Sequence, residues 1–294
     1  MSKAKITKAV FPVGGLGTRF LPATKSMPKE MLPVVDKPLI HYAFEEAKAA
    51  GIEQFIFVTG RNKNAIANHF DHAHELQTLL GSKNKKKELE TASDWLPDAG
   101  NILFTRQQQP LGLGHAIWCA RHMIGDEPFA VILADDMVLS KTPCLKQMVN
   151  AYSGGNMLAV TDIPRAQTNQ YGIVDIDKKA TQKNKSLVKA KGLVEKPDPR
   201  KAPSTLSIIG RYILQPDVFT FLDKQKPGAG GEIQITDAIN KMIGKHDVYG
   251  YRYSGTRYDC GSVAGYVAAN VAYALQRKDL KKQVHKEIKT LLKE

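Results

Sequence analysis

Two continuous apolar runs, FIFVT at residues 55–59 and FAVILA at residues 129–134, most constrain the fold of this chain. A strand that is covered on both faces is apolar throughout, so these runs predict strands inside a sheet with helices on both sides. Other segments fit the same scheme: strands are expected at residues 9–13 and 102–105, and helices at residues 38–50, 64–70 and 115–124. Alternation of this kind is typical of a Rossmann-like wound α/β sheet.

The middle of the chain follows a different pattern. Strand-like segments occur around Ala159 and at residues 171–176, 191–196 and 205–214, with little helix between them. They predict an antiparallel or mixed extension of the sheet. A strand at residues 248–253 and helices at residues 216–222, 232–243 and 262–275 complete the expected fold. We therefore expect a wound mixed sheet with a smaller antiparallel extension and C-terminal helices.

The chain has 294 residues, 43% of them hydrophobic, which is enough for a sizeable core. We expect one large domain over residues 1–276, with a first half at about 1–155 and a second at about 156–276. Residues 277–294 are expected to form a basic amphipathic helix that packs on its own domain or on a neighbouring subunit of a homodimer or homotetramer. One face of this helix carries Leu280, Val284, Ile288 and Leu291.

The composition of the chain limits its expected cellular location and its expected binding partners. An excess of 42 Lys and Arg over 29 Asp and Glu gives a formal charge of +13, which favours anionic partners, either phosphorylated small molecules or nucleic acid. Three cysteines without a CxxC pair argue against a disulfide framework or a zinc site. No apolar stretch approaches the ~20 residues that span a bilayer, so a cytoplasmic protein is expected. The lysines at residues 83–87 are expected in a solvated loop.

A glycine-rich turn follows the first expected strand. Gly14, Gly15 and Gly17 can turn backbone amides together toward an anion, as phosphate-binding loops do. Arg19 and Lys29 then add positive charge on a segment that its prolines keep stiff. The loop matches neither the GxGxxG fingerprint, because Phe20 replaces the last glycine, nor the GxxxxGK[ST] loop. This combination predicts a polyphosphate site.

The stretch GGLGTRF, followed by PKEMLP, resembles the signature of the sugar-phosphate nucleotidyltransferases. Matching segments run nearly to residue 276, and those after Lys29 are similar to the uridylyltransferases of this family. The resemblance implies the nucleotide-diphospho-sugar transferase type of fold. It also implies that Arg19 and Lys29 grip the triphosphate, as phosphoryl transfer requires mainly positioning and charge neutralisation. UTP and glucose 1-phosphate are the implied substrates.

The segment RQQQPLGLGHA resembles the nucleobase-reading loop of the family, with Gln107 and Gly112 at the matching positions. A glutamine amide offers a donor and an acceptor, which suits the edge of uracil. Glu30 is expected to accept a hydrogen bond from uracil N3 and so to favour UTP over dTTP. His115 is expected to be a structural residue of the following helix.

The metal site is expected at the end of the FAVILA strand, where open α/β sheets bind ligands. Asp135 is the first expected ligand of Mg²⁺, which takes one or two carboxylates together with phosphate oxygens and water. RYDCG resembles the later element that brings a second aspartate to the metal, so Asp259 is the second expected ligand. Asp259 alternatively begins the turn that caps the helix after Ser262.

Three further segments match the sugar-binding strands of the family in order: YGIVDID, GLVEKP and IIGRYIL. Gly172, Glu195 and Lys196 are the implied sugar-phosphate residues. Lys196 is expected to hold the phosphate, and Glu195 to accept hydrogen bonds from sugar hydroxyls. No general base is needed, because a phosphate monoester is mostly dianionic at neutral pH, with a second pKa near ~6.

Three alternatives remain open from the sequence. A thymidylyltransferase of the same fold would use dTTP. A nucleic-acid-binding protein would exploit the positive charge, although basic residues interleaved with stacking aromatics are missing and no nucleic acid is expected. A non-catalytic relative would have lost the chemistry, against which the presence of Arg19, Lys29, Asp135 and Lys196 argues.

Overall fold

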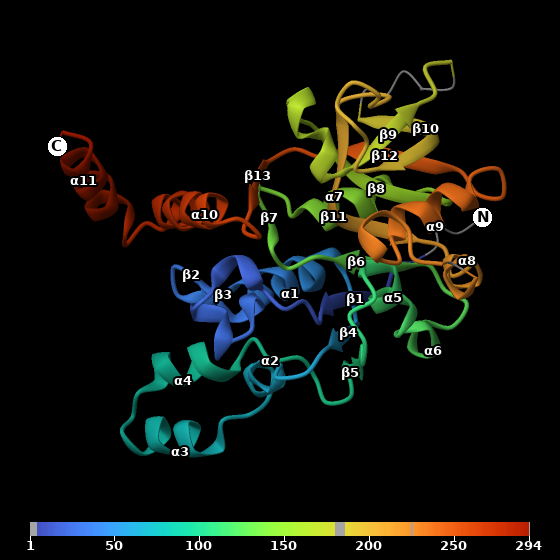
Figure 1. The fold of residues 1–294 in the computed structure, drawn as a ribbon. Helices are drawn as coiled ribbons and strands as arrows, with labels where there is room; N and C mark the ends of the chain where they lie inside the picture. Colours follow the sequence, from blue (N-terminus) through green and yellow to red (C-terminus); the bar gives the residue numbers. More distant parts are fainter. Residues whose placement is uncertain (1–4, 180–185, 225, 294) are drawn as a thin grey trace.

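The computed structural model describes residues 5–179, 186–224 and 226–293 (Figure 1). Its centre is a nine-stranded sheet. In spatial order the strands are β5 (Ile102–Arg106), β4 (Gln54–Thr59), β1 (Lys8–Val13), β6 (Phe129–Ile132), β11 (Leu206–Leu214), β8 (Asn156–Asp162), β12 (Val248–Arg252), β10 (Leu187–Glu195) and β9 (Gly172–Ile176).

The two parts of the sheet differ in strand direction. The first four strands, β5 to β6, are parallel, as a wound α/β sheet requires. β11 then runs antiparallel to both β6 and β8, and β10 runs antiparallel to β12 and β9. Only β8 and β12 pair in parallel in this part. The expected mixed sheet, with its antiparallel extension, is confirmed.

Helices cover both faces of the sheet. Along β1, Ala9, Phe11 and Val13 enter one buried cluster while Val10 enters the other, because successive side chains of a strand point to opposite faces. The first cluster lies under α1 (Leu39–Ala50) and α7 (Cys144–Ala151). The second lies under α5 (Leu113–Trp118), α8 (Val218–Asp223) and α9 (Ile235–Met242). Each large side chain buried in this way contributes roughly 1.5–3 kcal/mol of transfer free energy.

Short elements frame the carboxyl edge of the parallel strands. β7 (Asp136–Leu139) pairs with β13 (Thr256–Asp259), and β2 (Pro33–Val34) pairs with β3 (Lys37–Pro38), both antiparallel. A third, smaller cluster that includes Leu32, Met137 and Ala269 packs this region against α10 (Val263–Gln276). The 3-10 turns are η1 (Thr18–Phe20), η2 (Ala23–Lys25), η3 (Lys29–Met31), η4 (Arg165–Gln170) and η5 (Ala229–Gly231).

The helical parts of the chain differ from the expectations at two places. The solvated loop expected at the lysine run is correct only in part: Lys83 and Lys85 are exposed between α3 (His74–Ser82) and α4 (Lys86–Ser93), whereas Lys86 and the residues after it are helical. Lys, Glu, Leu and Gln are good helix formers, although most of their side chains here remain exposed. The expected helix at residues 115–124 is divided into α5 and α6 (Arg121–Ile124). α2 (Asn64–His69) lies where it was expected.

The C-terminal helices extend away from the sheet (Figure 1). α11 (Lys281–Leu291) forms as expected, with Leu280, Val284 and Ile288 half-buried and Leu291 69% exposed. Within the described part of the chain, no helix combines the length and the apolarity that a membrane crossing needs.

Candidate active site

The loops that follow the four parallel strands meet at one edge of the sheet. The glycine-rich turn follows β1, Lys63 follows β4, Gln107 follows β5 and Asp135 follows β6. Parallel strands place their carboxyl ends side by side, which is where ligands bind in open α/β sheets.

A cavity of about 530 Å³ opens at this edge, between the two halves of the chain. Six of the residues expected at the site line it: Arg19, Asp135, Gly172, Glu195, Lys196 and Asp259. The fold thus brings residues as far apart in the sequence as Arg19 and Asp259 to a single cavity.

Lys29 and Asp135 form a direct ion pair beside the cavity. Lys29 Nζ donates to Asp135 Oδ2 at 2.5 Å, and each side chain is about one quarter exposed. Burial alone would raise the pKa of Asp135, but the ammonium of Lys29 outweighs it and holds that pKa below its usual value. Burial would likewise lower the pKa of Lys29, which Asp135 and Glu30 instead raise. Both groups are therefore charged at neutral pH.

Asp259 is placed beside Asp135 by the small β7–β13 sheet. In its register Asp259 pairs with Asp136, and the next amide, Cys260 N, donates to Asp135 O at 2.7 Å. A Cβ atom added to Gly261 would lie 2.9 Å from Asp259 Oδ1 and 3.2 Å from Asp135 Oδ2. One oxygen of each carboxylate therefore borders the same small space, which glycine leaves open. Ser262 Oγ, which accepts from Gly265 N, caps α10.

The glycine-rich turn and its cations lie along the same edge. Gly17 has a φ of +68°, a left-handed conformation that favours glycine, and its carbonyl accepts from Thr24 Oγ1 at 2.7 Å. A Cβ on Gly15 would lie 3.6 Å from Lys29 Cε, so Lys29 runs directly beside the turn. The exposed Arg19 donates from Nη1 to Gly261 O at 3.2 Å.

Gln107 lies against Gly14 and is hydrogen-bonded to Gly112. Gln107 Nε2 donates to Gly112 O at 2.9 Å, and Gln107 Oε1 is 3.1 Å from the place of a Cβ on Gly14. Gly112 has a φ of +105°, and a Cβ there would come within 2.7 Å of Glu232 Cβ, so only glycine fits this approach of α5 to the loop before α9.

Glu30 does not lie at the base-reading edge with Gln107. Its side chain is 2% exposed, and its Oε2 accepts from the buried Lys63 Nζ at 2.8 Å. The expected contact between Glu30 and uracil N3 is therefore not supported, because the carboxylate is enclosed in protein and neutralised by Lys63. The adjacent charges of Glu30 and Lys29 explain why Glu30 raises the pKa of Lys29.

The expected sugar-phosphate residues form the opposite wall of the cavity. Gly172 pairs with Glu195 across β9 and β10, and Glu195 Oε2 would be 3.1 Å from a Cβ on Gly172. Lys196 has a φ of +46° and remains 44% exposed, with Nζ 3.6 Å from Glu195 Oε1. A largely enclosed carboxylate and a partly exposed ammonium are thus paired on this wall.

Three residues of the cavity wall were missed from the sequence. Arg257 Nε donates to Asp136 Oδ1 at 2.6 Å, and its guanidinium lies 4.8 Å from the ring centre of Tyr171. Tyr171 OH in turn donates to Asp259 Oδ2 at 3.4 Å. Asp136 and Arg257 stand in the segments already singled out, next to Asp135 and Asp259, but only the β7–β13 pairing shows that they meet.

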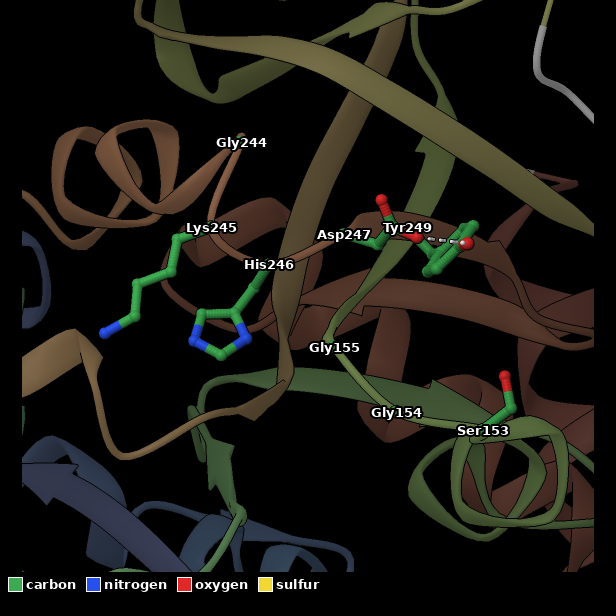
Figure 2. A pocket seen from close by; sticks show the side chains of 8 residues that line it. All are labelled: Ser153, Gly154, Gly155, Gly244, Lys245, His246, Asp247 and Tyr249. Atoms are coloured by element: carbon green, nitrogen blue, oxygen red, sulfur yellow. Dashed lines mark hydrogen bonds between the residues drawn. The ribbon is translucent and has the colours of Figure 1, made fainter.

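A second cavity, of about 470 Å³, lies where β8 and β12 begin, at the opposite edge of the sheet (Figure 2). Two of its side chains, Lys245 and His246, already contact Asp217, at 3.0 Å and 2.5 Å. Asp247 accepts from Tyr249 OH at 3.0 Å, as Figure 2 shows. None of the residues expected at the site lines this cavity.

Comparisons with known proteins agree with the geometry. The model of the nucleotidyl transferase family matches residues 8–276. The chain is 48% identical to the UTP–glucose-1-phosphate uridylyltransferase of Staphylococcus haemolyticus over 289 residues, which is 98% of this chain and 99% of that protein. Among solved structures, the UTP-bound UGPase of Acinetobacter baumannii is 41% identical with a TM-score of 0.88, covering 97% and 99% of the two chains.

A UDP-glucose pyrophosphorylase complexed with UDP-glucose is 42% identical with a TM-score of 0.82, covering 93% of this chain and all of the other. The family match and the relatives extend over nearly the whole length, so the expected family is confirmed. This chain belongs to the nucleotidyl transferase family.

Proposed function

We propose that this protein transfers UMP from UTP to α-D-glucose 1-phosphate, giving UDP-glucose and pyrophosphate. The observation that supports the proposal is a single cavity whose lining includes Arg19, Asp135, Asp259, Glu195 and Lys196. A phosphate oxygen of the sugar phosphate forms the new bond to the α-phosphorus, and the bond from that phosphorus to the bridging oxygen of pyrophosphate breaks. No proton has to move, because the attacking phosphate is already a dianion.

The cavity and the loops beside it have separate roles in this proposal. Gly14, Gly15 and Gly17 receive the triphosphate with backbone amides, and Arg19 and Lys29 neutralise the charge that develops on it. Gln107 and Gly112 read the base. Lys196 binds the phosphate of the sugar phosphate, while Glu195 and the Gly172 backbone bind the sugar, which orients the nucleophile. The nucleotide half is then residues 1–155 and the sugar-phosphate half residues 156–276.

The carboxylates of Asp135 and Asp259 would hold Mg²⁺. Asp135 and Asp259 each bring a carboxylate oxygen close to Gly261, and a pair of neighbouring carboxylates suits a hard cation that takes its remaining ligands from phosphate and water. Within the described residues no group of three or more His, Cys, Asp or Glu side chains is arranged for a metal, which leaves this carboxylate pair. When bound, Mg²⁺ would neutralise phosphate charge and orient the triphosphate.

The proposal also covers the oligomeric state and the cellular compartment of the protein. We propose a homodimer or homotetramer, to be measured by light scattering after gel filtration. We also propose that the protein works in the cytoplasm, since both substrates are charged and would cross an apolar barrier only at high cost.

The proposal is tested by measuring pyrophosphate release from UTP, dTTP, CTP and ATP, each with glucose 1-phosphate and galactose 1-phosphate. UTP with glucose 1-phosphate should be fastest, and chelation of divalent metal should stop the reaction. Preference for dTTP would identify a thymidylyltransferase instead. Absence of turnover with every pair, together with salt-sensitive binding of RNA or DNA, would favour the nucleic-acid alternative.

A further inference from the structure

The side chain of Gln107 is held by two neighbours at the start of α5. Its Nε2 donates to Gly112 O at 2.9 Å and lies 3.2 Å from His115 Nδ1. An amide nitrogen carries two hydrogens and accepts none, so these contacts use both of its donors. Gln107 therefore has one polar side-chain atom left, the acceptor Oε1.

The contact with Gln107 defines the protonation of His115. Because the amide can only donate, Nδ1 must accept, and the ring proton stands on Nε2 of a neutral imidazole. Partial burial, with a smaller effect from Arg121, lowers the pKa of His115, which keeps the ring neutral at physiological pH. The ring also stacks on Trp118 at 5.7 Å, and the Arg121 guanidinium lies 3.5 Å from the Trp118 ring centre. The imidazole is thus fixed on its own helix.

The remaining acceptor faces the glycine-rich turn. Gln107 Oε1 lies 3.1 Å from the place of a Cβ on Gly14, and the side-chain hydrogen bonds that Gln107 makes within the described residues use Nε2. An acceptor at this edge suits a base that presents a ring N–H. Uracil and thymine carry N3–H, whereas cytosine has an unprotonated, accepting N3.

We propose that His115 is a specificity-determining positioning residue, which orients the Gln107 amide so that its Oε1 selects uracil against cytosine. This rests on the proposed function, in which Gln107 reads the base. Uracil and thymine share the N3–H donor, so the arrangement does not separate UTP from dTTP. It separates UTP from CTP.

The test uses a matched pair of variants of the full chain, His115→Asn and His115→Leu. Asparagine and leucine have similar shapes, but the asparagine oxygen can accept close to where Nδ1 accepted. The readout is the ratio of Kd values for CTP and UTP, measured by isothermal titration calorimetry, together with the ratio of kcat/KM values. Binding is measured without the sugar phosphate, so this readout does not depend on turnover.

We expect His115→Leu to reduce the preference for UTP over CTP by about fivefold to tenfold, the size of one net hydrogen bond. His115→Asn should keep the ratio within about twofold of the parent protein. In a Gln107→Met background, His115→Leu should leave the ratio unchanged, because the amide it orients is gone. An equal loss of affinity for both nucleotides, or equal ratios in the Asn and Leu variants, would overturn the inference. Failure of every variant and of the parent to turn over UTP would count against the proposed function alone.

Discussion

Glu30 and Lys63 form an ion pair in which the two side chains are 2% and 7% exposed and Lys63 Nζ lies 2.8 Å from Glu30 Oε2. The pair connects η3, which carries Lys29, to the loop between β4 and α2. It thereby ties the segment that carries Lys29 to the parallel sheet through a contact that no local pattern in the sequence indicates.

Removal of one partner of this pair should be strongly destabilising, because the other charge remains buried. We expect Lys63→Met to lower the free energy of unfolding by about 3–5 kcal/mol, and Glu30→Gln with Lys63→Met together to cost less than the sum of the single changes. Denaturant titration measures the free energy of unfolding of the single and the double variants. The exposed Lys85–Glu88 pair, at 3.5 Å, provides the control, since Lys85→Met should cost under about 0.5 kcal/mol. Equal effects at the two lysines would contradict the ion-pair argument.

Gly261→Ala tests the space between the two aspartates. The added Cβ would come within 2.9 Å of Asp259 Oδ1 and would press on both carboxylates. We expect weaker Mn²⁺ binding, followed by electron paramagnetic resonance, and at least about tenfold lower turnover. Gly81→Ala is the control, as a Cβ there meets nothing within 4 Å. Unchanged Mn²⁺ affinity in Gly261→Ala would show that the metal is held elsewhere.

The two aspartates should differ in their effect on the reaction. Asp135 contacts Lys29 directly, so Asp135→Asn alters both the metal site and the position of that cation. We expect it to reduce kcat by about 10²-fold or more, the size associated with loss of one strong electrostatic contact in a transition state. Asp259→Asn should reduce kcat less. Steady-state pyrophosphate release at saturating Mg²⁺ compares the two, and a larger loss from Asp259→Asn would reverse the assignment of the main ligand.

Lys196 should act mainly on the sugar phosphate. Its side chain is 44% exposed and lines the cavity directly after the end of β10. Lys196→Ala should raise KM for glucose 1-phosphate by about tenfold or more while leaving KM for UTP within about twofold. Lys191→Ala, an exposed lysine on the same strand, is the matched control. A parallel rise in both KM values would argue that Lys196 contacts the triphosphate.

His69 should make stability depend on pH. Burial, with a smaller effect from His41, lowers the pKa of His69 from 6.5 to about 4. The folded protein therefore binds fewer protons than the unfolded chain, and stability present above pH 6.5 is lost as the pH falls toward 4. Unfolding titrations at pH 7.5 and pH 5 measure how much the free energy of unfolding falls between these two pH values. With allowance for the partial exposure of His69, His69→Gln should make this fall smaller by roughly 1–2 kcal/mol. His285→Gln, at an exposed position on α11, should leave the loss unchanged.

Several elements were predictable because their signals are local. FIFVT and FAVILA became the buried strands β4 and β6, and the glycine-rich turn follows β1 as expected. The helix α4, which begins within the lysine run, was missed because helix-forming residues whose side chains stay exposed look like a loop in the sequence. The role expected for Glu30 depended on where its side chain points. Its neighbour Lys63 is 33 residues away, and only folding brings the two together.

By itself, the sequence determined the type of sheet, the position of most of its strands along the chain and the glycine-rich turn after the first strand, since periodicity and local turn chemistry suffice for these. Only the tertiary structure decided that Asp259 meets Asp135 through the β7–β13 pair, that Glu30 is buried against Lys63, and that His115 holds the Gln107 amide. The physical reason is that hydrogen bonds and ion pairs require atoms to be about 3 Å apart, and the relative position of distant segments is set by packing of the whole core rather than by any one segment.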